Sequence, residues 1–273
     1  MSSDAKSNAN SLGAEKIAGE VAENSKRPEP TFVHAGVDAV LMQFGEQLDP
    51  CMPGFLASLR AQIIAELNDV VYEVVPSYAS LLVYYEPRAI GTYDLEQVLN
   101  TIASDTPWLC SPWSADSGAP GKLVEVPIYY YELDENVAEN DMAFVCEQTG
   151  LARNEVIARH SGRDYQVYAL GFAPGFAYLG ALDKALQLPR LANPRKNIAA
   201  GSVGIAEAQT AVYPQASPGG WHIIGYSPFT WFEPKNHELT PVQVGDRIRF
   251  KAISKAEYEH AKAKNQAQLG GAV

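Results

Sequence analysis

The sequence predicts an α+β protein whose two halves are built differently. In the N-terminal half, apolar runs follow the order strand, helix, strand, strand, helix, strand, which is the ferredoxin-like pattern. In the C-terminal half, glycine and proline separate many short β-type runs, as is typical of an antiparallel barrel or sandwich. Of the 273 residues, 47% are hydrophobic and 19% charged. This composition excludes wholesale disorder, collagen and coiled coil, and the length suits one large or two modest domains.

Residues 1–30 are rich in Ser, Asn, Ala and Glu. They hold few side chains that could be buried, so we expect a disordered tail. The tail has no apolar stretch of the kind that secretory signals contain, and no run in the chain approaches the ~18 apolar residues of a membrane span.

Apolar spacing places the elements of the N-terminal half. Strands are expected over residues 37–44, 70–75 and 80–85. Two stretches show helical spacing, one near Asp49 and one after Asp94, and aspartate suits the start of a helix. Their apolar side chains are Phe55, Leu56, Leu59, Ile63, Ile64 and Leu67 in the first stretch and Leu95, Val98, Leu99 and Ile102 in the second.

A linker rich in glycine and proline, residues 106–122, precedes another strand candidate that starts at Leu123. Either this strand closes the first domain or the domain boundary falls in the linker. We place the N-terminal domain over residues 31–121 and the C-terminal domain over residues 122–273.

The C-terminal half is expected to combine helices with short strands. Helices are predicted over residues 141–148, 154–160 and 254–264, the last with Ser254 and Glu257 spaced as a capping box. The strand candidates are residues 166–172, 202–206, 210–213, 221–226 and 247–251.

The formal net charge of −11 argues against nonspecific binding to nucleic acid. The three cysteines, Cys51, Cys110 and Cys146, are widely spaced and lack a CxxC pair. We therefore expect reduced thiols in a cytoplasmic protein rather than a disulfide framework or a zinc site. No histidine pair has HExxH-type spacing, so no metal site is predicted.

Residues 171–225 are the most informative segment, with eight glycines and five prolines. Such loops are either barrel corners or a ligand surface where backbone comes close. The segment carries Lys184, Arg190, Arg195 and Lys196 against two acidic residues, a net charge of +2 in an acidic protein. A carboxylate or phosphate ligand would suit this charge, unless the arginines satisfy loop carbonyls or lie over apolar surface.

Two histidines are candidates for chemistry. His160 ends a predicted helix, where it could either stabilise the helix dipole or transfer a proton. His222 follows Trp221 in a strand candidate, so the two side chains point to opposite faces, and Trp221 is the better candidate for the core. The sequence has no P-loop and no GxSxG nucleophile elbow.

The same segment carries a family resemblance. The motifs are Gly171-Phe172-x-Pro174-Gly175-Phe176-x-Tyr178-Leu179-Gly180, Pro189-Arg190, Pro194-Arg195, Ala200-Gly201-Ser202-Val203-Gly204-Ile205, Gln209-Thr210, Tyr213-Pro214 and Ser217-Pro218-Gly219-Gly220-Trp221. Together with Val126-Pro127-Ile128-Tyr129 and Val244-Gly245-Asp246, they resemble the family of the 5-oxoprolinase B subunit, also called allophanate hydrolase subunit 1 or KipI-like. The resemblance covers residues 38–250.

The resemblance implies a cyclophilin-like β-barrel after an N-terminal α/β domain. It implies a protein that acts with the A and C subunits of 5-oxoprolinase, in a complex that consumes ATP to open 5-oxo-L-proline to L-glutamate. Two alternatives come with the family: a regulator that inhibits a sensor histidine kinase, and a relative of enzymes acting on urea or allophanate. A cyclophilin-like fold does not by itself imply prolyl isomerase activity.

The resemblance and the charge pattern together nominate site residues. His160, Arg195 and Gln209 are the expected catalytic residues. The expected substrate-binding residues are Phe172, Pro174, Gly175, Phe176, Tyr178, Arg190, Gly201, Ser202, Gly204, Thr210, Tyr213, Pro218, Gly219, Gly220, Trp221 and His222. The chain departs from the family at Tyr226, where members often have an arginine, and at Tyr130 and Tyr131, where many have glycines.

Overall fold

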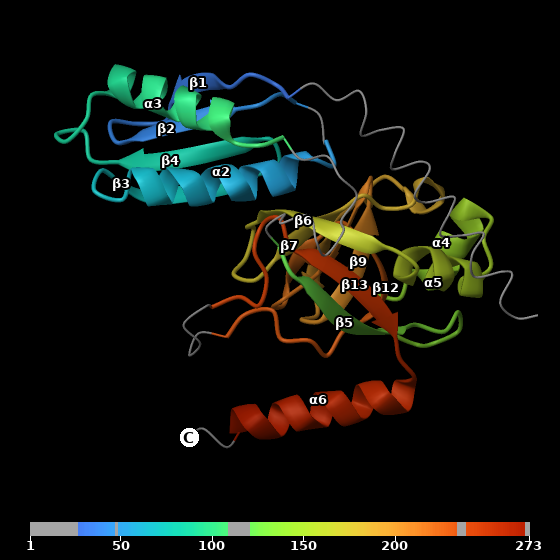
Figure 1. The fold of residues 1–273 in the computed structure, drawn as a ribbon. Helices are drawn as coiled ribbons and strands as arrows, with labels where there is room; N and C mark the ends of the chain where they lie inside the picture. The colour runs from blue at the N-terminus through green and yellow to red at the C-terminus, as the bar shows by residue number, and fades with distance from the viewer. Residues whose placement is uncertain (1–26, 47–48, 109–120, 234–238, 271–273) are drawn as a thin grey trace, which may run out of the picture. The chain divides into compact units, whose positions relative to one another are not determined.

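The computed structural model describes residues 27–46, 49–108, 121–233 and 239–270. The chain divides into two compact units, residues 1–120 and 121–273 (Figure 1). Most of the predicted tail and most of the predicted linker lie outside the described residues.

The described part of the N-terminal unit is an antiparallel four-stranded sheet with two helices. The strand order is β1-β2-β4-β3. The elements are β1 (Thr31–His34), β2 (Ala39–Gln43), α2 (Met52–Glu66), β3 (Val71–Ser77), β4 (Ser80–Tyr85) and α3 (Thr92–Asp105). Alternate strand residues such as Val40 and Val83 share one core with Leu59 of α2 and Leu99 of α3. The helical spacing in the sequence therefore marked most of the buried side chains, but Ile64 is 39% exposed and Leu67 and Val98 are only partly buried.

One strand of the predicted N-terminal order is wrong. The run that starts at Leu123 forms β5 (Leu123–Tyr130), which pairs with strands of the C-terminal unit. The edge beside β2 is instead occupied by β1, which precedes the predicted first strand. The ferredoxin-like prediction is thus not confirmed. Local apolar pattern shows that a run is a strand but cannot show which sheet it joins.

The C-terminal unit contains a closed seven-stranded barrel, which confirms the barrel rather than the sandwich. The strand order is β6-β13-β5-β12-β9-β10-β7, and β7 pairs back to β6. The β5–β13 pair is parallel and the others are antiparallel. The strands are β5, β6 (Asp164–Leu170), β7 (Ala177–Gly180), β9 (Ser202–Ala206), β10 (Gln209–Val212), β12 (His222–Tyr226) and β13 (Arg247–Ala252).

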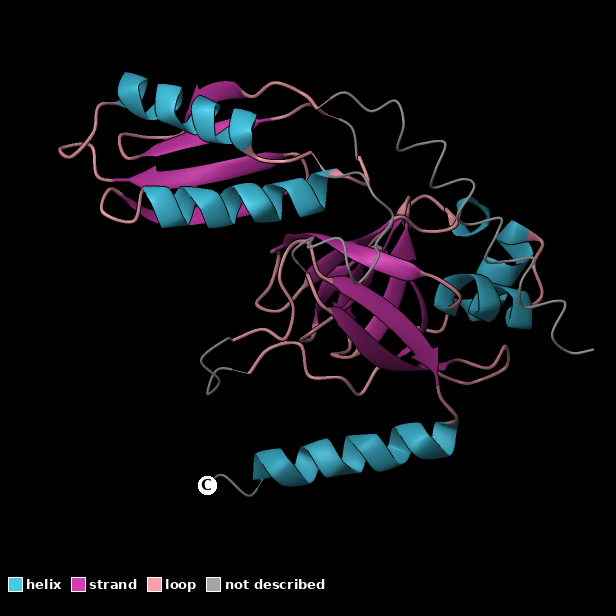
Figure 2. Ribbon diagram, viewed as in Figure 1, coloured by secondary structure: helices cyan, strands magenta, loops and turns pink. Residues whose placement is uncertain are grey.

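Helices and a small second sheet surround the barrel (Figure 2). They are α4 (Met142–Thr149), α5 (Arg153–Ser161), a short 3₁₀ helix η1 (Lys184–Leu186), α6 (Lys255–Gly270), and the pair β8 (Arg195–Ile198) and β11 (Ser217–Gly219). The predicted capping box at α6 is present, because Ser254 N donates to Glu257 Oε2 at 2.7 Å and Glu257 N donates to Ser254 Oγ at 3.3 Å.

The cysteine prediction needs a correction. Cys51, at the N-terminal end of α2, is disulfide-bonded, whereas Cys146 in α4 is a free thiol. Cys110 lies outside the described residues. Sequence spacing could not show this, since a disulfide depends on distance in the fold.

Across the described ranges, no helix combines the length and the apolarity that crossing a membrane requires.

The turn between β6 and β7 depends on a glycine. Gly175 has a φ of +81°, and a Cβ there would lie 2.5 Å from the carbonyl oxygen of Trp231. Gly171, at the other end of the same turn, has open space around its Cβ position. Gly175→Ala should lower the free energy of unfolding by about 2–4 kcal/mol, since it adds left-handed strain and a backbone clash.

Urea denaturation checks this prediction, with Gly171→Ala as the matched control, which we expect to change stability by less than about 1 kcal/mol. Equal effects of the two substitutions would show that the turn does not require glycine at residue 175.

Candidate functional site

His160 lies in the barrel core rather than at the surface. It is the last but one residue of α5, it is 0% exposed, and its ring stacks on that of Phe250 with centroids 4.8 Å apart. Nδ1 is 2.7 Å from the hydroxyl of Tyr130, and Nε2 is 2.9 Å from Oγ1 of Thr210. Both ring nitrogens are therefore engaged inside the protein.

The hydrogen bonds fix the protonation of this histidine. Thr210 Oγ1 donates to the carbonyl oxygen of Gly204 at 3.0 Å, so it accepts from Nε2–H of His160. Nδ1 consequently accepts from the Tyr130 hydroxyl. Burial, together with the charge of Arg163, lowers the pKa of His160 to about 3. The ring is neutral at physiological pH and connects β5, α5, β10 and β9.

Arg195 is held in an ion pair. Its Nη1 and Nη2 donate to Oδ2 and Oδ1 of Asp141 at 2.9 and 2.6 Å. Asp141 Oδ2 also accepts from the amide of Ile223 at 2.7 Å, and the Asp141 side chain is only 10% exposed. The pair joins β8, the start of α4 and β12, so the guanidinium is occupied within the barrel unit.

The glycine-rich strands are also internally paired. Gln209 and Thr210 are buried in β10, and Gly204 lies opposite Ala211 and Ile223 within the sheet. The amide of Gly201 donates to the carbonyl of Tyr213 at 2.6 Å, so this N–H is not available to an oxyanion. Ser202 is fully buried, and its hydroxyl has no hydrogen-bond partner within the described residues.

Five predicted aromatic residues do come together. Phe176 contacts Phe172, Tyr178, Tyr213 and Trp221, with ring centroids 4.8–6.0 Å apart. Phe176, Tyr213 and Trp221 are buried, Tyr178 is partly buried, and Phe172 is 63% exposed. We call these residues the aromatic cluster. It runs from the barrel core to the surface, where an apolar side chain meets solvent.

Arg190 lies at the rim of the aromatic cluster. Its Cβ is 3.8 Å from the position that a Cβ would take at Gly220. Burial raises the pKa of Tyr178, and it raises the pKa of Tyr213 to about 12. The positive charge of Arg190 acts against both shifts. The Arg190 side chain is 55% exposed and pairs with the equally exposed Glu207 at 3.3 Å. Arg190 can therefore exchange this partner for an anionic ligand at little cost.

The remaining predicted residues divide between surface and core. Pro174 and Pro218 are exposed, and Gly219 packs against the Tyr213 ring. Both Trp221 and His222 are buried, although only one was expected inside. The reason is that Phe144 of α4 stacks on the outer His222 ring at 5.1 Å, while His222 Nε2 donates to the carbonyl of Pro189 at 2.9 Å.

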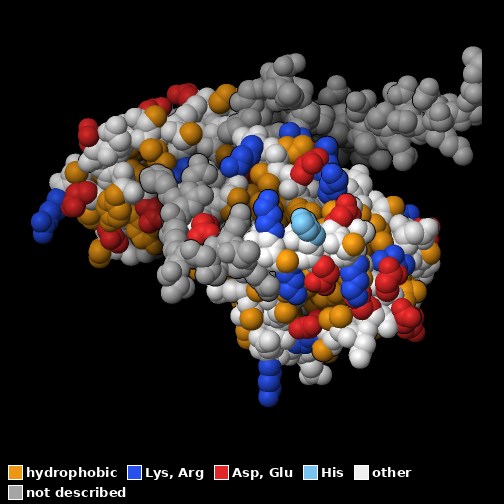
Figure 3. All heavy atoms as spheres, turned by 90° about the horizontal axis from the view of Figure 1, so that it is seen from below, with side chains coloured by type: hydrophobic (Ala, Val, Ile, Leu, Met, Phe, Trp, Pro, Cys, Tyr) orange, Lys and Arg blue, Asp and Glu red, His pale blue; other side chains and the backbone are white. Residues whose placement is uncertain are grey.

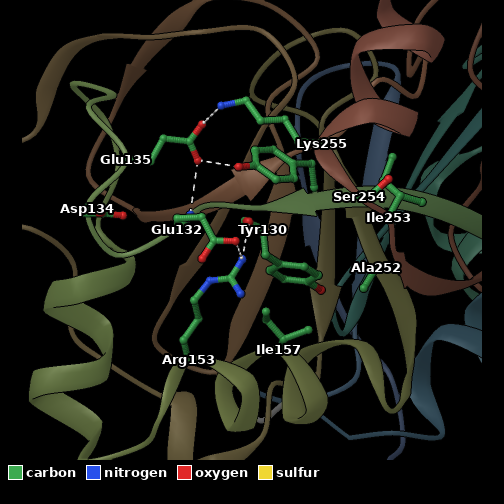
Figure 4. A pocket seen from close by; sticks show the side chains of 11 residues that line it. Tyr130, Glu132, Asp134, Glu135, Arg153, Ile157, Ala252, Ile253, Ser254 and Lys255 are labelled. Carbon is green, nitrogen blue, oxygen red and sulfur yellow. Dashed lines mark hydrogen bonds and ion pairs between the residues drawn. The ribbon is translucent and has the colours of Figure 1, made fainter.

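A pocket of about 570 Å³ has none of the nominated residues in its lining, and sequence reasoning missed it (Figure 4). Its charged side chains form two ion pairs, Glu132–Arg153 at 2.9 Å and Glu135–Lys255 at 2.7 Å. The pairs join residues 21 and 120 positions apart in the sequence, which no local pattern reveals. The acidic residues directly after β5 are the one local signal.

Charges of both signs are interspersed on the face shown in Figure 3. Within the described ranges, no group of three His, Cys, Asp or Glu side chains is placed to hold a metal ion. The candidate functional site is the rim of the aromatic cluster, because Arg190 and Phe172 are exposed there and Arg190 lies beside Gly220.

The chain is similar to known proteins over most of its length. The sequence model of the carboxyltransferase domain, subdomain C and D, matches residues 30–242. The B subunit of 5-oxoprolinase from Bacillus subtilis (strain 168) is 32% identical over 226 residues, 82% of this chain and 92% of that protein. The B subunit of 5-oxoprolinase from Escherichia coli O157:H7 is 42% identical over 213 residues, 75% of this chain and 89% of that protein.

Solved structures show the same fold. That of TTHA0988 superposes with a TM-score of 0.65 at 30% identity, covering 79% of this chain and 40% of that chain, so this chain spans about two fifths of its length. The Kluyveromyces lactis urea carboxylase has a TM-score of 0.65 at 20% identity, covering 87% of this chain and 23% of that one, which is a likeness of fold alone.

Proposed function

Because this chain belongs to the family of the 5-oxoprolinase B subunit, we propose that it is one subunit of an ATP-dependent enzyme that opens 5-oxo-L-proline to L-glutamate. Identity of 32–42% with relatives of that name, over 75–82% of the chain, is the observation that carries the proposal. The A and C subunits of 5-oxoprolinase are the proposed partners. A urea- or allophanate-type substrate is the alternative, and its support is a likeness of fold.

The chemistry explains why ATP would be needed. Amide resonance makes the lactam carbonyl a poor electrophile, so its oxygen needs activation, for instance by phosphorylation. Attack by water at the activated carbon then cleaves the ring C–N bond, and the nitrogen leaves as the amine. Hydrolysis of the resulting acyl phosphate releases inorganic phosphate and leaves the new carboxylate. ATP and 5-oxoproline are both anions, so a basic group must lie at the site.

The geometry supports a subunit that is inactive alone. His160 and Arg195 are engaged inside the barrel, and the exposed basic group beside the aromatic cluster is Arg190. Phe172, 63% exposed, lies in the same cluster and is the kind of apolar side chain that a partner surface buries. We assign anion binding to Arg190 and partner contact to Phe172.

We also propose a finer fold assignment for each of the two units. The antiparallel order β1-β2-β4-β3 with two helices supports a ferredoxin-like N-terminal unit in which β1 replaces the last strand. The closed barrel supports a cyclophilin-like C-terminal unit.

Co-purification with the A and C subunits, followed by ATP-dependent release of glutamate from 5-oxoproline, tests the proposal. Turnover should require all three subunits. Arg190→Ala should reduce turnover at least about tenfold without changing stability by more than about 0.5 kcal/mol, because the side chain is exposed. Lys184→Ala, an exposed lysine of the same segment, is the matched control.

A stable three-subunit complex that releases glutamate equally well with Arg190→Ala would contradict the role of Arg190. A stable complex with no turnover on 5-oxoproline would favour another amide or urea-like substrate.

A further inference from the structure

The pocket away from the aromatic cluster has an apolar floor between two ion pairs. The uncharged residues that line it include Ile157, Ala252 and Ile253 together with Tyr129 and Tyr130. In Figure 4 the Glu132–Arg153 pair and the Glu135–Lys255 pair lie on opposite sides of the β5 ribbon. A ligand lying across the end of β5 would therefore meet one pair with each of its ends.

Each pair has one member held in place. Arg153 donates through Nε to the carbonyl of Tyr131 at 2.7 Å and through Nη2 to that of Tyr130 at 2.8 Å. Glu135 accepts from the Tyr129 hydroxyl at 2.6 Å and from the amide of Glu132 at 3.2 Å. Lys255 and Tyr129 contribute to lowering the pKa of Glu135, which keeps its carboxylate charged.

The other member of each pair is exposed and has bonding capacity left. The Lys255 side chain is 60% exposed, and its ammonium has three donors, one of which is used on Glu135. The Glu132 side chain is 56% exposed, and one of its two oxygens forms an ion pair with Arg153. Lys255 can thus bind a carboxylate and Glu132 an ammonium while both keep their present partners.

The charge of the pocket selects among ligands. Its charged residues are Glu132, Asp134, Glu135, Arg153 and Lys255, three acidic and two basic, a net charge of −1. An anion such as 5-oxoproline or ATP would add to this negative charge, whereas a neutral zwitterion would pair both ends. The volume of about 570 Å³ lies within the range of small-molecule sites.

We propose that this pocket binds a small zwitterion with an apolar side chain, of amino-acid to dipeptide size. The ligand carboxylate contacts Lys255, its ammonium contacts Glu132, and its side chain lies on the floor formed by Ile157 and Ile253. The site is distinct from the Arg190 rim, and the proposal concerns binding by this chain alone, so it does not depend on the proposed enzyme activity.

Isothermal titration calorimetry on the full chain tests the proposal. The probes are L-leucine and L-leucyl-L-leucine, each compared with its N-acetyl form, which lacks the ammonium, and its methyl ester, which lacks the carboxylate. At least one zwitterion should bind, and blocking either of its ends should weaken its binding at least tenfold. The two zwitterions distinguish an amino acid from a dipeptide as the ligand.

Variants place the binding in the pocket. Glu132→Gln and Lys255→Met should each weaken the binding of the zwitterion at least fivefold. The exposed controls, Glu147→Gln on α4 and Lys264→Met on α6, should leave the affinity within twofold of the wild type. Circular dichroism confirms that each variant is folded. The proposal is overturned if neither zwitterion binds, if blocked probes bind equally well, or if the pocket variants behave like their controls.

Discussion

Asp141→Ala should lower the free energy of unfolding by about 3–5 kcal/mol, because it leaves a largely buried guanidinium without its counter-ion. Asp141 accepts two hydrogen bonds from Arg195 and one from the amide of Ile223. Without the carboxylate, the terminal nitrogens of Arg195 keep, among the described residues, only the carbonyl of Trp221 at 3.4 Å. Urea denaturation followed by tryptophan fluorescence measures the loss.

Arg195→Ala should be destabilising for the reciprocal reason, since it leaves the buried Asp141 carboxylate unpaired. The double variant Asp141→Ala/Arg195→Ala should lose clearly less stability than the sum of the two single variants, because neither charge is then left alone. The exposed pair offers the control: Arg190→Ala should change stability by less than about 0.5 kcal/mol. Additive single effects would show that the two side chains act independently.

This result bears on how Arg195 is interpreted. The family resemblance nominates Arg195 as catalytic, so loss of turnover in Arg195→Ala would be taken as support. The structure predicts the same loss from unfolding of the barrel unit. Turnover must therefore be read together with stability, and the exposed Arg190 is the cleaner test of anion binding.

Elements with a strong local pattern were predictable. Most of the α2 and α3 side chains at helical spacing, such as Leu59 and Leu99, enter the core, and Ser254 with Glu257 caps α6 as expected. The sheet that contains β5 was not predictable, because its partners β12 and β13 come about a hundred residues later. Alternation along one strand carries no information about such distant pairing.

The candidate site was predictable only in part. Clustered glycines left two interpretations open, barrel corners or a ligand surface, and at one of these glycines, Gly219, the backbone lies close to the Tyr213 ring. The partners that occupy the charged residues were invisible: Asp141 is 54 positions from Arg195, and Thr210 is 50 positions from His160. Residue type alone cannot tell an available arginine from an engaged one.

His160→Gln should remove a component of the acid sensitivity of this protein. In the folded state, burial lowers the pKa of His160 to about 3, from an ordinary value of 6.5. Between these pH values the unfolded chain binds a proton at this ring and the folded chain does not. Its contribution to stability is therefore complete above pH 6.5 and is lost as pH falls toward 3, at about 1.4 kcal/mol per pH unit.

The measurement is the difference in unfolding free energy between the wild type and His160→Gln from pH 7.5 to pH 5. At pH 7.5 the variant should be less stable by about 2 kcal/mol, since it loses the ring stacked on Phe250 and disturbs the bonds to Tyr130 and Thr210. By pH 5 the difference should shrink by about 2 kcal/mol. Only the wild type has a ring that is protonated in the unfolded chain and unprotonated in the folded one, so only the wild type loses stability as the pH falls.

His260→Gln, at an exposed position of α6, is the matched control, and its difference from the wild type should stay constant over the same pH range. A constant difference for His160→Gln as well would mean that the His160 ring takes up its proton in the folded barrel as readily as in the unfolded chain. Water or a substrate would then have access to it, and proton transfer by His160 would again be a credible role. A shrinking difference places His160 in the core, and the base for ring opening must come from another residue or from a partner protein.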